Sequence, residues 1–128
     1  MNIDALKTTL SLHFNSSEFA CKCGCGAKDV SPNLIELLEV IRQYANAPIT
    51  IVSGRRCEAH NTKCGGAKNS QHLLGTAADI QIKGMTAQKA HQFIEEMHNS
   101  RKCRVGGLGR YQTFTHVDVR EKTARWSG

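Results

Sequence analysis

Residues 70–79 have the sequence Ser-Gln-His-Leu-Leu-Gly-Thr-Ala-Ala-Asp, which carries an imidazole near one end and a carboxylate at the other. His72 stands just before a glycine turn at Leu74-Gly75, and the mostly apolar run of residues 76–82 that follows predicts a strand. A turn that leads directly into a strand can bring the ring of His72 close to the carboxylate of Asp79. This short segment therefore predicts a piece of the fold and part of a candidate metal site.

A second segment supplies another imidazole. Residues 113–119, Thr-Phe-Thr-His-Val-Asp-Val, are rich in β-branched side chains and predict a strand on which His116 and Asp118 point to the same face. Two imidazoles and one carboxylate are ligands that zinc accepts, and a catalytic zinc keeps its fourth position open for water. The candidate metal ligands are therefore His72, Asp79 and His116.

Three motifs in this order carry a family resemblance: Ile-Val-Ser-Gly-Arg-Arg at residues 51–56, Ser-x-His-x-x-Gly-x-Ala-x-Asp at residues 70–79, and Phe-Thr-His-Val-Asp at residues 114–118. With them the chain closely resembles the D-Ala-D-Ala carboxypeptidase family of zinc peptidases (LAS-type), which also includes peptidoglycan endopeptidases of bacteria and phages. The resemblance covers about residues 15–120. It implies that His72, Asp79 and His116 hold one catalytic zinc ion.

The resemblance also implies residues that bind the substrate. Arg56 corresponds to the family's arginine that binds a substrate carboxylate, with Arg55 in the usual tyrosine position, and a planar guanidinium suits that task. Without the motif, the pair would be interpreted as a solvated basic pair. Ser70 is expected to cap or orient the loop that carries His72, and we include it among the residues that contact substrate.

The general base does not follow the pattern of the related branches. Related branches of the family carry a Glu three residues, or a His two residues, before the last zinc ligand, and here those positions hold Thr113 and Phe114. Neither can accept a proton. Asp118 is the remaining acid in the motif, so we predict it as the catalytic base. The alternative is that Asp118 orients a histidine ligand without touching the substrate.

The length of 128 residues and a hydrophobic content of 40% fit one domain with one modest core, so we predict a single zinc peptidase domain over residues 1–128. The fold class is α+β, with a central, mainly antiparallel sheet and two main helices, as in the LAS or hedgehog-like fold that the resemblance implies. Expected helices begin after Ser31 and Thr86. Expected strands cover residues 8–14, 49–52, 76–82, 105–111 and 113–119, the last two forming a hairpin around Tyr111-Gln112.

The net charge of +6 favours an anionic partner, and aromatic residues make up only 5% of the chain, which gives little support to a surface that stacks nucleic-acid bases. We expect peptidoglycan or its stem peptides as the partner, no nucleic acid, no membrane insertion and a monomeric state. The first residues lack the pattern of a secretory signal. We therefore expect a protein made in the cytoplasm that acts on the bacterial wall or in the periplasm, and that phages or prophages encode.

The chain contains six cysteines. Cys21 and Cys25 have the spacing of a structural zinc pair, whereas the one-residue gaps around Cys23 do not, so a second, structural zinc at these three cysteines is the less favoured alternative. Cys57 and Cys64 flank a short segment and could form a disulfide if that segment folds back.

The leading hypothesis is a zinc metallopeptidase that hydrolyses the peptidoglycan stem peptide, as a D-Ala-D-Ala carboxypeptidase or as an endolysin-type endopeptidase. The alternative is a catalytically inactive, zinc-stabilised module that binds the cell wall, which the missing Glu or His of the base would explain. A nucleic-acid-binding zinc protein built on the first three cysteines ranks last, because it leaves the order of His72, Asp79 and His116 unexplained.

Overall fold

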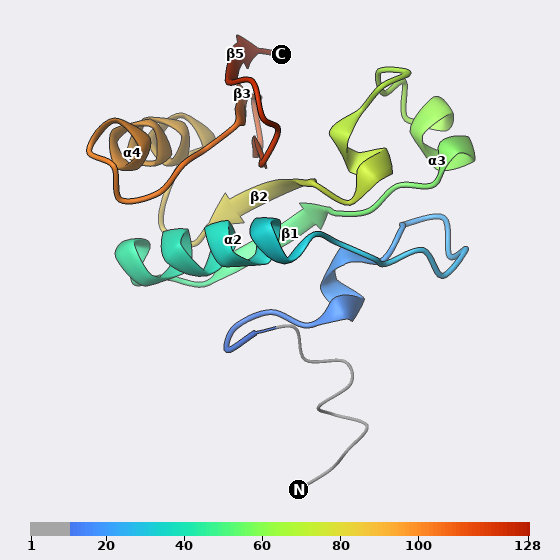
Figure 1. Cartoon of the computed structure of the whole chain (residues 1–128), viewed down its shortest axis with the longest axis horizontal. Coiled ribbons are helices and arrows are strands. Elements are labelled where there is room, and N and C mark those ends of the chain that lie inside the picture. The colour runs from blue at the N-terminus through green and yellow to red at the C-terminus, as the bar shows by residue number, and fades with distance from the viewer. Residues whose placement is uncertain (1–10) are drawn as a thin grey trace, which may run out of the picture.

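The computed structural model describes residues 11–128. Within that range two long helices and three short helical segments accompany five strands (Figure 1). The helical segments are η1 (Ser16–Phe19), α2 (Pro32–Ala45), α3 (Glu58–Lys63), η2 (Gln71–Leu74) and α4 (Ala87–Asn99), and the strands are β1 (Ile49–Ser53), β2 (Ala77–Ile82), β3 (Gly107–Arg110), β4 (Thr115–Asp118) and β5 (Ala124–Ser127).

The five strands form one sheet in the order β1-β2-β4-β3-β5. All neighbours pair antiparallel except β3 and β5, which run parallel. Successive side chains of a strand point to opposite faces of the sheet. On β2, Ala78, Ile80 and Ile82 therefore join the hydrophobic core, while Asp79 faces the other side.

Helix α2 forms where the sequence predicts it. The side chain of Ser31 accepts a hydrogen bond from the backbone N–H of Asn33, and Pro32 occupies the first helical turn. Asn46 ends the helix in a left-handed conformation, with φ at 50°. The side chains that point into the core recur at helical spacing: Leu34, Ile35, Leu37, Leu38 and Ile41.

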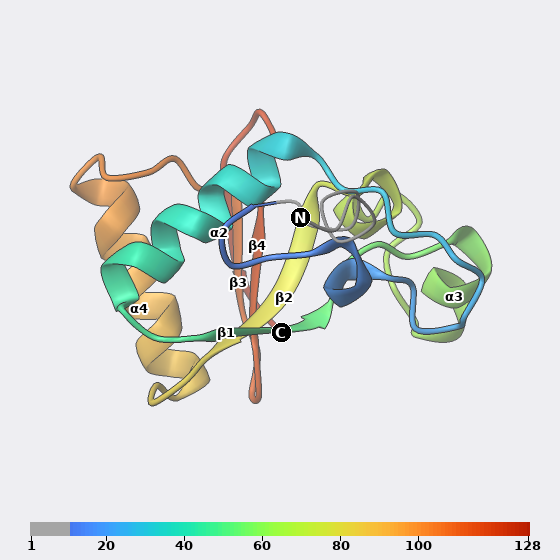
Figure 2. The same ribbon diagram turned by 90° about the horizontal axis from the view of Figure 1, so that it is seen from below.

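Helix α4 begins after Thr86, whose side chain accepts a hydrogen bond from the backbone N–H of Lys89, and it buries Ala90, Ile94 and Met97. These residues and the buried residues of α2 belong to one hydrophobic cluster with the core face of the sheet. Figure 2 shows α2 and α4 on one side of the molecule and α3 on the other. The predicted α+β class with a mainly antiparallel sheet and two main helices is confirmed.

Some predicted elements differ from the structure. Of the strand expected at residues 8–14, residues 8–10 lie outside the described range, residues 11–13 form bends, and Phe14 belongs to no strand. The turn between β3 and β4 spans residues 111–114, longer than the hairpin turn expected at Tyr111-Gln112. Strand β5 was not predicted, because its four residues carry no continuous apolar run and only alternate ones are partly buried.

None of the helices within residues 11–128 combines the length and the apolar character needed to cross a lipid bilayer.

Gly75 ends η2 with φ at 71°, and its carbonyl accepts a hydrogen bond from the backbone N–H of Ser31. A Cβ atom at Gly75 would collide with the backbone of Asp29.

Gly84 has a similar φ of 85° but open space around it, so Gly84→Ala measures the backbone cost alone, about 1 kcal/mol. We expect Gly75→Ala to lower the free energy of unfolding by about 2 kcal/mol more than Gly84→Ala does, because Gly75→Ala adds the collision with Asp29 to the backbone cost. Urea denaturation of the two variants measures this difference. Equal losses for the two variants would contradict this packing.

Candidate metal centre

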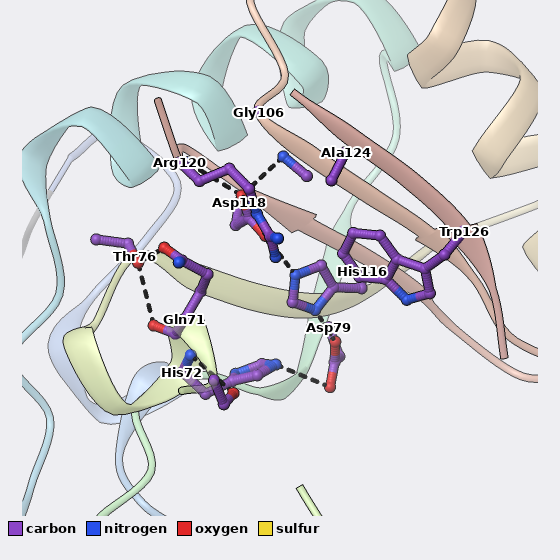
Figure 3. Close-up of polar contacts among 12 residues, drawn as sticks. Gln71, His72, Thr76, Asp79, Gly106, His116, Asp118, Arg120, Ala124 and Trp126 are labelled. Carbon is purple, nitrogen blue, oxygen red and sulfur yellow. Dashed lines mark hydrogen bonds and ion pairs between the residues drawn. The ribbon is translucent and has the colours of Figure 1, made fainter. Parts of the chain in front are cut away.

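Three side chains from three elements converge on the sheet face opposite α2 and α4. Asp79 on β2 and His116 on β4 are direct partners in the antiparallel pairing of these strands, and His72 is carried by η2. All three are buried, and a ligand atom of each lies within 4.8 Å of the others. The structure thus brings together the three side chains that the sequence predicts as metal ligands (Figure 3).

The ring of His72 is oriented by the loop that follows β1. Its Nδ1 lies 2.7 Å from the carbonyl oxygen of Gly54, and because a carbonyl only accepts, Nδ1 carries the hydrogen. Nε2 then faces Asp79, 3.3 Å from Oδ2. The side chain of Ser70 accepts a hydrogen bond from the backbone N–H of His72, which is the capping role that we expected for it.

The ring of His116 is oriented from behind by Asp118. Its Nε2 lies 2.7 Å from Oδ2 of Asp118, so this nitrogen donates to the carboxylate. The other ring nitrogen, Nδ1, lies 3.1 Å from Oδ1 of Asp79. Both histidines therefore hold one nitrogen in an outward hydrogen bond and turn the other toward Asp79, the arrangement typical of metal-ligating histidines.

The donor set fits a small divalent cation of the zinc type. Bonds of roughly 2 Å in a tetrahedral site place neighbouring ligand atoms about 3.3 Å apart. The contacts of Oδ1 of Asp79 with His116, at 3.1 Å, and of Oδ2 of Asp79 with His72, at 3.3 Å, lie near that spacing. Each contact between a ring nitrogen and a carboxylate oxygen needs either a proton or a cation between them. A divalent cation would replace both protons at once.

Electrostatics favour the charged forms of Asp79, His116 and Asp118. Burial alone would raise the pKa of Asp79, but its hydrogen bonds with His116 and His72 outweigh burial and lower that pKa to about 2. Burial opposes charge on His116 as well, yet its contacts with Asp118 and Asp79 raise its pKa. The pKa of Asp118 is lowered, because hydrogen bonds with His116 and Arg120 overcome the effect of burial.

Asp118 is fully buried, and its oxygens are occupied. It accepts hydrogen bonds from His116, from the side chain and backbone N–H of Arg120, and from the backbone N–H of Gly107. The ring of His116 lies between Asp118 and Asp79, as Figure 3 shows. These contacts favour the orienting role over the predicted role of Asp118 as the catalytic base.

Arg56 follows β1 and lines the same cleft as the three ligands. Its guanidinium donates to Oδ2 of Asp79 at 3.3 Å, to the side chain of Asn61 at 3.2 Å and to Ser53 at 3.3 Å. Three of the five N–H groups of an arginine are thus engaged, and within residues 11–128 the other two have no hydrogen-bond partner, so they can bind a further anion. Arg55 turns elsewhere, with its guanidinium near the carbonyl oxygen of Asp29.

The cleft above the ligands has a volume of about 430 Å³. Besides the predicted residues, it is lined by Trp126 and Arg120, which the sequence analysis missed. The centroid of the Trp126 ring lies 4.9 Å from that of the His116 ring, and Nε1 of Trp126 donates a hydrogen bond to the hydroxyl of Tyr111. Neither residue belongs to a motif used in the prediction. The only feature of the sequence that could have pointed to Trp126 is that it is the single tryptophan of the chain and lies in a short polar segment.

The structure forms no disulfide among the six cysteines, all of which lie within residues 11–128. The bond considered between Cys57 and Cys64 is therefore absent. The sulfur of Cys57 lies near those of Cys21 and Cys23, whereas the sulfur of Cys64 contacts the ring of His60. The segment between the two cysteines is helix α3, which keeps them at opposite ends.

Comparisons with known proteins show what this chain is similar to. A family model described as Peptidase M15 matches residues 12–118. The chain is 33% identical over 100 residues to the probable peptidoglycan L,D-endopeptidase MepK of Haemophilus influenzae. The match covers 70% of this chain and 50% of that protein, so the chain spans about half the length of this relative. A search of solved structures matches the L-Ala D-Glu endopeptidase ChiX of Serratia marcescens, with a TM-score of 0.50, 15% identity, and coverage of 71% of this chain and 80% of that one. At that identity the likeness supports the fold alone.

Proposed function

The chain belongs to the peptidase M15 family, and from that premise we propose that it is a zinc-dependent endopeptidase that cleaves the stem peptide of peptidoglycan. The observation that carries the proposal is the convergence of His72, Asp79 and His116 at the base of a cleft with Arg56 on its wall. The name of the MepK relative supports an endopeptidase over a D-Ala-D-Ala carboxypeptidase. Because the chain spans half of that relative, its own substrate has to be tested.

His72, Asp79 and His116 would hold the zinc ion. When bound, zinc polarises a scissile carbonyl and lowers the pKa of water, which supplies the nucleophile of hydrolysis. The protein's own residues fix the ligands: the carbonyl oxygen of Gly54 holds the ring of His72, and Asp118 holds that of His116. Fixed ligands avoid the cost of reorganisation when charge develops during the reaction.

Arg56 is proposed to bind a carboxylate of the substrate. Stem peptides carry several carboxylates, and the +6 charge of the chain attracts such an anion over a distance. Arg120 also lines the cleft, but its guanidinium is committed to Asp118 and lies 5.0 Å from the Trp126 ring centroid. Arg56 keeps two N–H groups without a partner in the described part of the chain, next to the proposed metal ligands, so it is the better candidate. Ser70, which also lines the cleft, is proposed as a secondary contact.

The second candidate function is a module that keeps the metal and binds the wall without cleaving it. It is favoured by one observation: Asp79 is the only carboxylate among the residues that line the described cleft, and it is a proposed ligand. A free carboxylate that could serve as the base is therefore lacking there. Direct measurement of cleavage separates the two functions.

We expect the zinc-loaded protein to release new amino groups from purified peptidoglycan and from synthetic stem peptides, with product masses that place the cut inside the stem. His116→Ala removes a proposed ligand and should abolish the products. His91→Ala is the matched control, because His91 lies on α4 outside the cleft, and its activity should equal that of the wild type.

Three other outcomes would change the proposal. Release of the terminal D-Ala alone would identify a carboxypeptidase. Retention on peptidoglycan without any product would identify the binding module. Activity that survives in His116→Ala would contradict the assignment of the metal centre.

Asp118→Ala tests the orienting role that we propose for Asp118. Loss of the carboxylate that holds a metal-ligating histidine typically lowers metal affinity by about 10–100-fold. We expect that loss in zinc affinity, measured by competition with a chelator, and we expect saturating zinc to restore much of kcat. Glu121→Ala, which removes an exposed carboxylate nearby, should change neither quantity. Unchanged zinc affinity together with a collapse of kcat at saturating zinc would instead support Asp118 as the base.

A further inference from the structure

A second group of potential metal ligands lies away from the cleft. The sulfur atoms of four cysteines all lie within 4.8 Å of one another; we call this group the thiol cluster, and its members are Cys21, Cys23, Cys25 and Cys57. Three come from the loop that follows η1, and the fourth precedes α3. Figures 1 and 2 show this loop beside the segment that leads into α3. Residues 36 positions apart in sequence therefore meet at one point.

The spacing of the sulfurs fits a shared cation and does not fit a disulfide. Cys21 lies 3.4 Å from Cys23 and 3.8 Å from Cys57, and Cys23 lies 3.6 Å from Cys57. A disulfide needs about 2.05 Å between its sulfurs. Four thiolates bound to zinc at about 2.3 Å form a tetrahedron whose edges are about 3.8 Å long. The three distances lie near that edge.

Backbone N–H groups point at two of these sulfurs. The backbone N–H of Cys57 donates to the sulfur of Cys21 at 3.4 Å, and that of His60 donates to the sulfur of Cys57 at 3.4 Å. Such donors favour the thiolate, which is the form of cysteine that binds metals. Cys21 is buried and Cys57 is partly buried, while the other two are exposed, so a cation can enter from solvent and then be enclosed.

We propose that the thiol cluster binds a second divalent cation, of the soft class to which zinc belongs, at a structural site distinct from the metal centre of the cleft. The sequence pattern offers only three of the ligands, and its one-residue gaps disfavour them. The structure adds Cys57, which completes the tetrathiolate set typical of structural zinc. On binding, the cation displaces the thiol protons to solvent, and no electrons are transferred.

The position of the thiol cluster predicts a structural role for this cation, between two loops. Cys57 directly follows Arg56, and the backbone N–H of Arg55 donates to the carbonyl oxygen of Phe19 at 2.9 Å. The cation would clamp the loop after η1 to the loop that carries Arg56. The metal-binding step is independent of any peptidase activity, so its test needs no substrate.

Cobalt substitution distinguishes the two metal sites. Cobalt bound by several thiolates gives an intense sulfur-to-metal charge-transfer absorption in the near ultraviolet, whereas cobalt bound by histidine and carboxylate does not. We expect this absorption in the reduced wild-type protein, in His116→Ala and in Cys64→Ser. Cys57→Ser should lose most of it. Cys64→Ser is the matched control because Cys64 is an exposed cysteine outside the thiol cluster.

Native mass spectrometry of the zinc-loaded proteins gives the second measurement. We expect about two zinc ions per chain in the wild type and in Cys64→Ser, and about one in Cys57→Ser and in His116→Ala. The wild-type cobalt spectrum alone decides the question if Cys57→Ser fails to fold. Absence of the charge-transfer absorption in the reduced wild type, with a single zinc ion that His116→Ala removes, would overturn the proposal.

Discussion

The antiparallel pairing of β2 with β4 is the constraint on which the rest of the site depends. It sets Asp79 directly opposite His116, so two potential ligands meet without any loop having to position them. Side chains alternate along a strand, and a slip of one residue in this register would turn the ligand on the shifted strand into the hydrophobic core. The core residues Ala78 and Val117, which are also opposite each other, oppose such a slip. The packing that stabilises the domain thus also specifies the site.

The two faces of the sheet have different roles. One face is covered by α2 and α4 and is apolar, whereas the other holds the ligand cluster and the cleft. On the cleft face, Gly107 allows Asp118 to approach β3, because a Cβ atom at Gly107 would collide with that carboxylate. Asp118 can then lie fully buried, paired with Arg120 and with His116. A buried carboxylate with this many donors keeps its charge, and it fixes the histidine in front of it.

The sequence allowed the main elements to be predicted, together with the three side chains that the structure brings to one point, because these predictions depend on local patterns. The cap at Ser31 and the helical spacing of apolar residues mark α2, and β-branched alternation marks β4. Other features depend on contacts between distant segments. Trp126 enters the cleft only because β5 pairs with β3, and Cys57 meets Cys21 only because the loops around η1 and α3 are packed together. The partners of Asp118 likewise become visible only in three dimensions, and they are the reason that we propose it as a support of His116.

The most direct test of the central claim is anomalous diffraction at the zinc absorption edge, from crystals grown with zinc. The account predicts an anomalous peak bounded by Nε2 of His72, a carboxylate oxygen of Asp79 and Nδ1 of His116, with the outward hydrogen bonds to Gly54 and Asp118 retained. A peak that is absent from this position, or a zinc ion bound through Nε2 of His116 with Asp118 displaced, would contradict it.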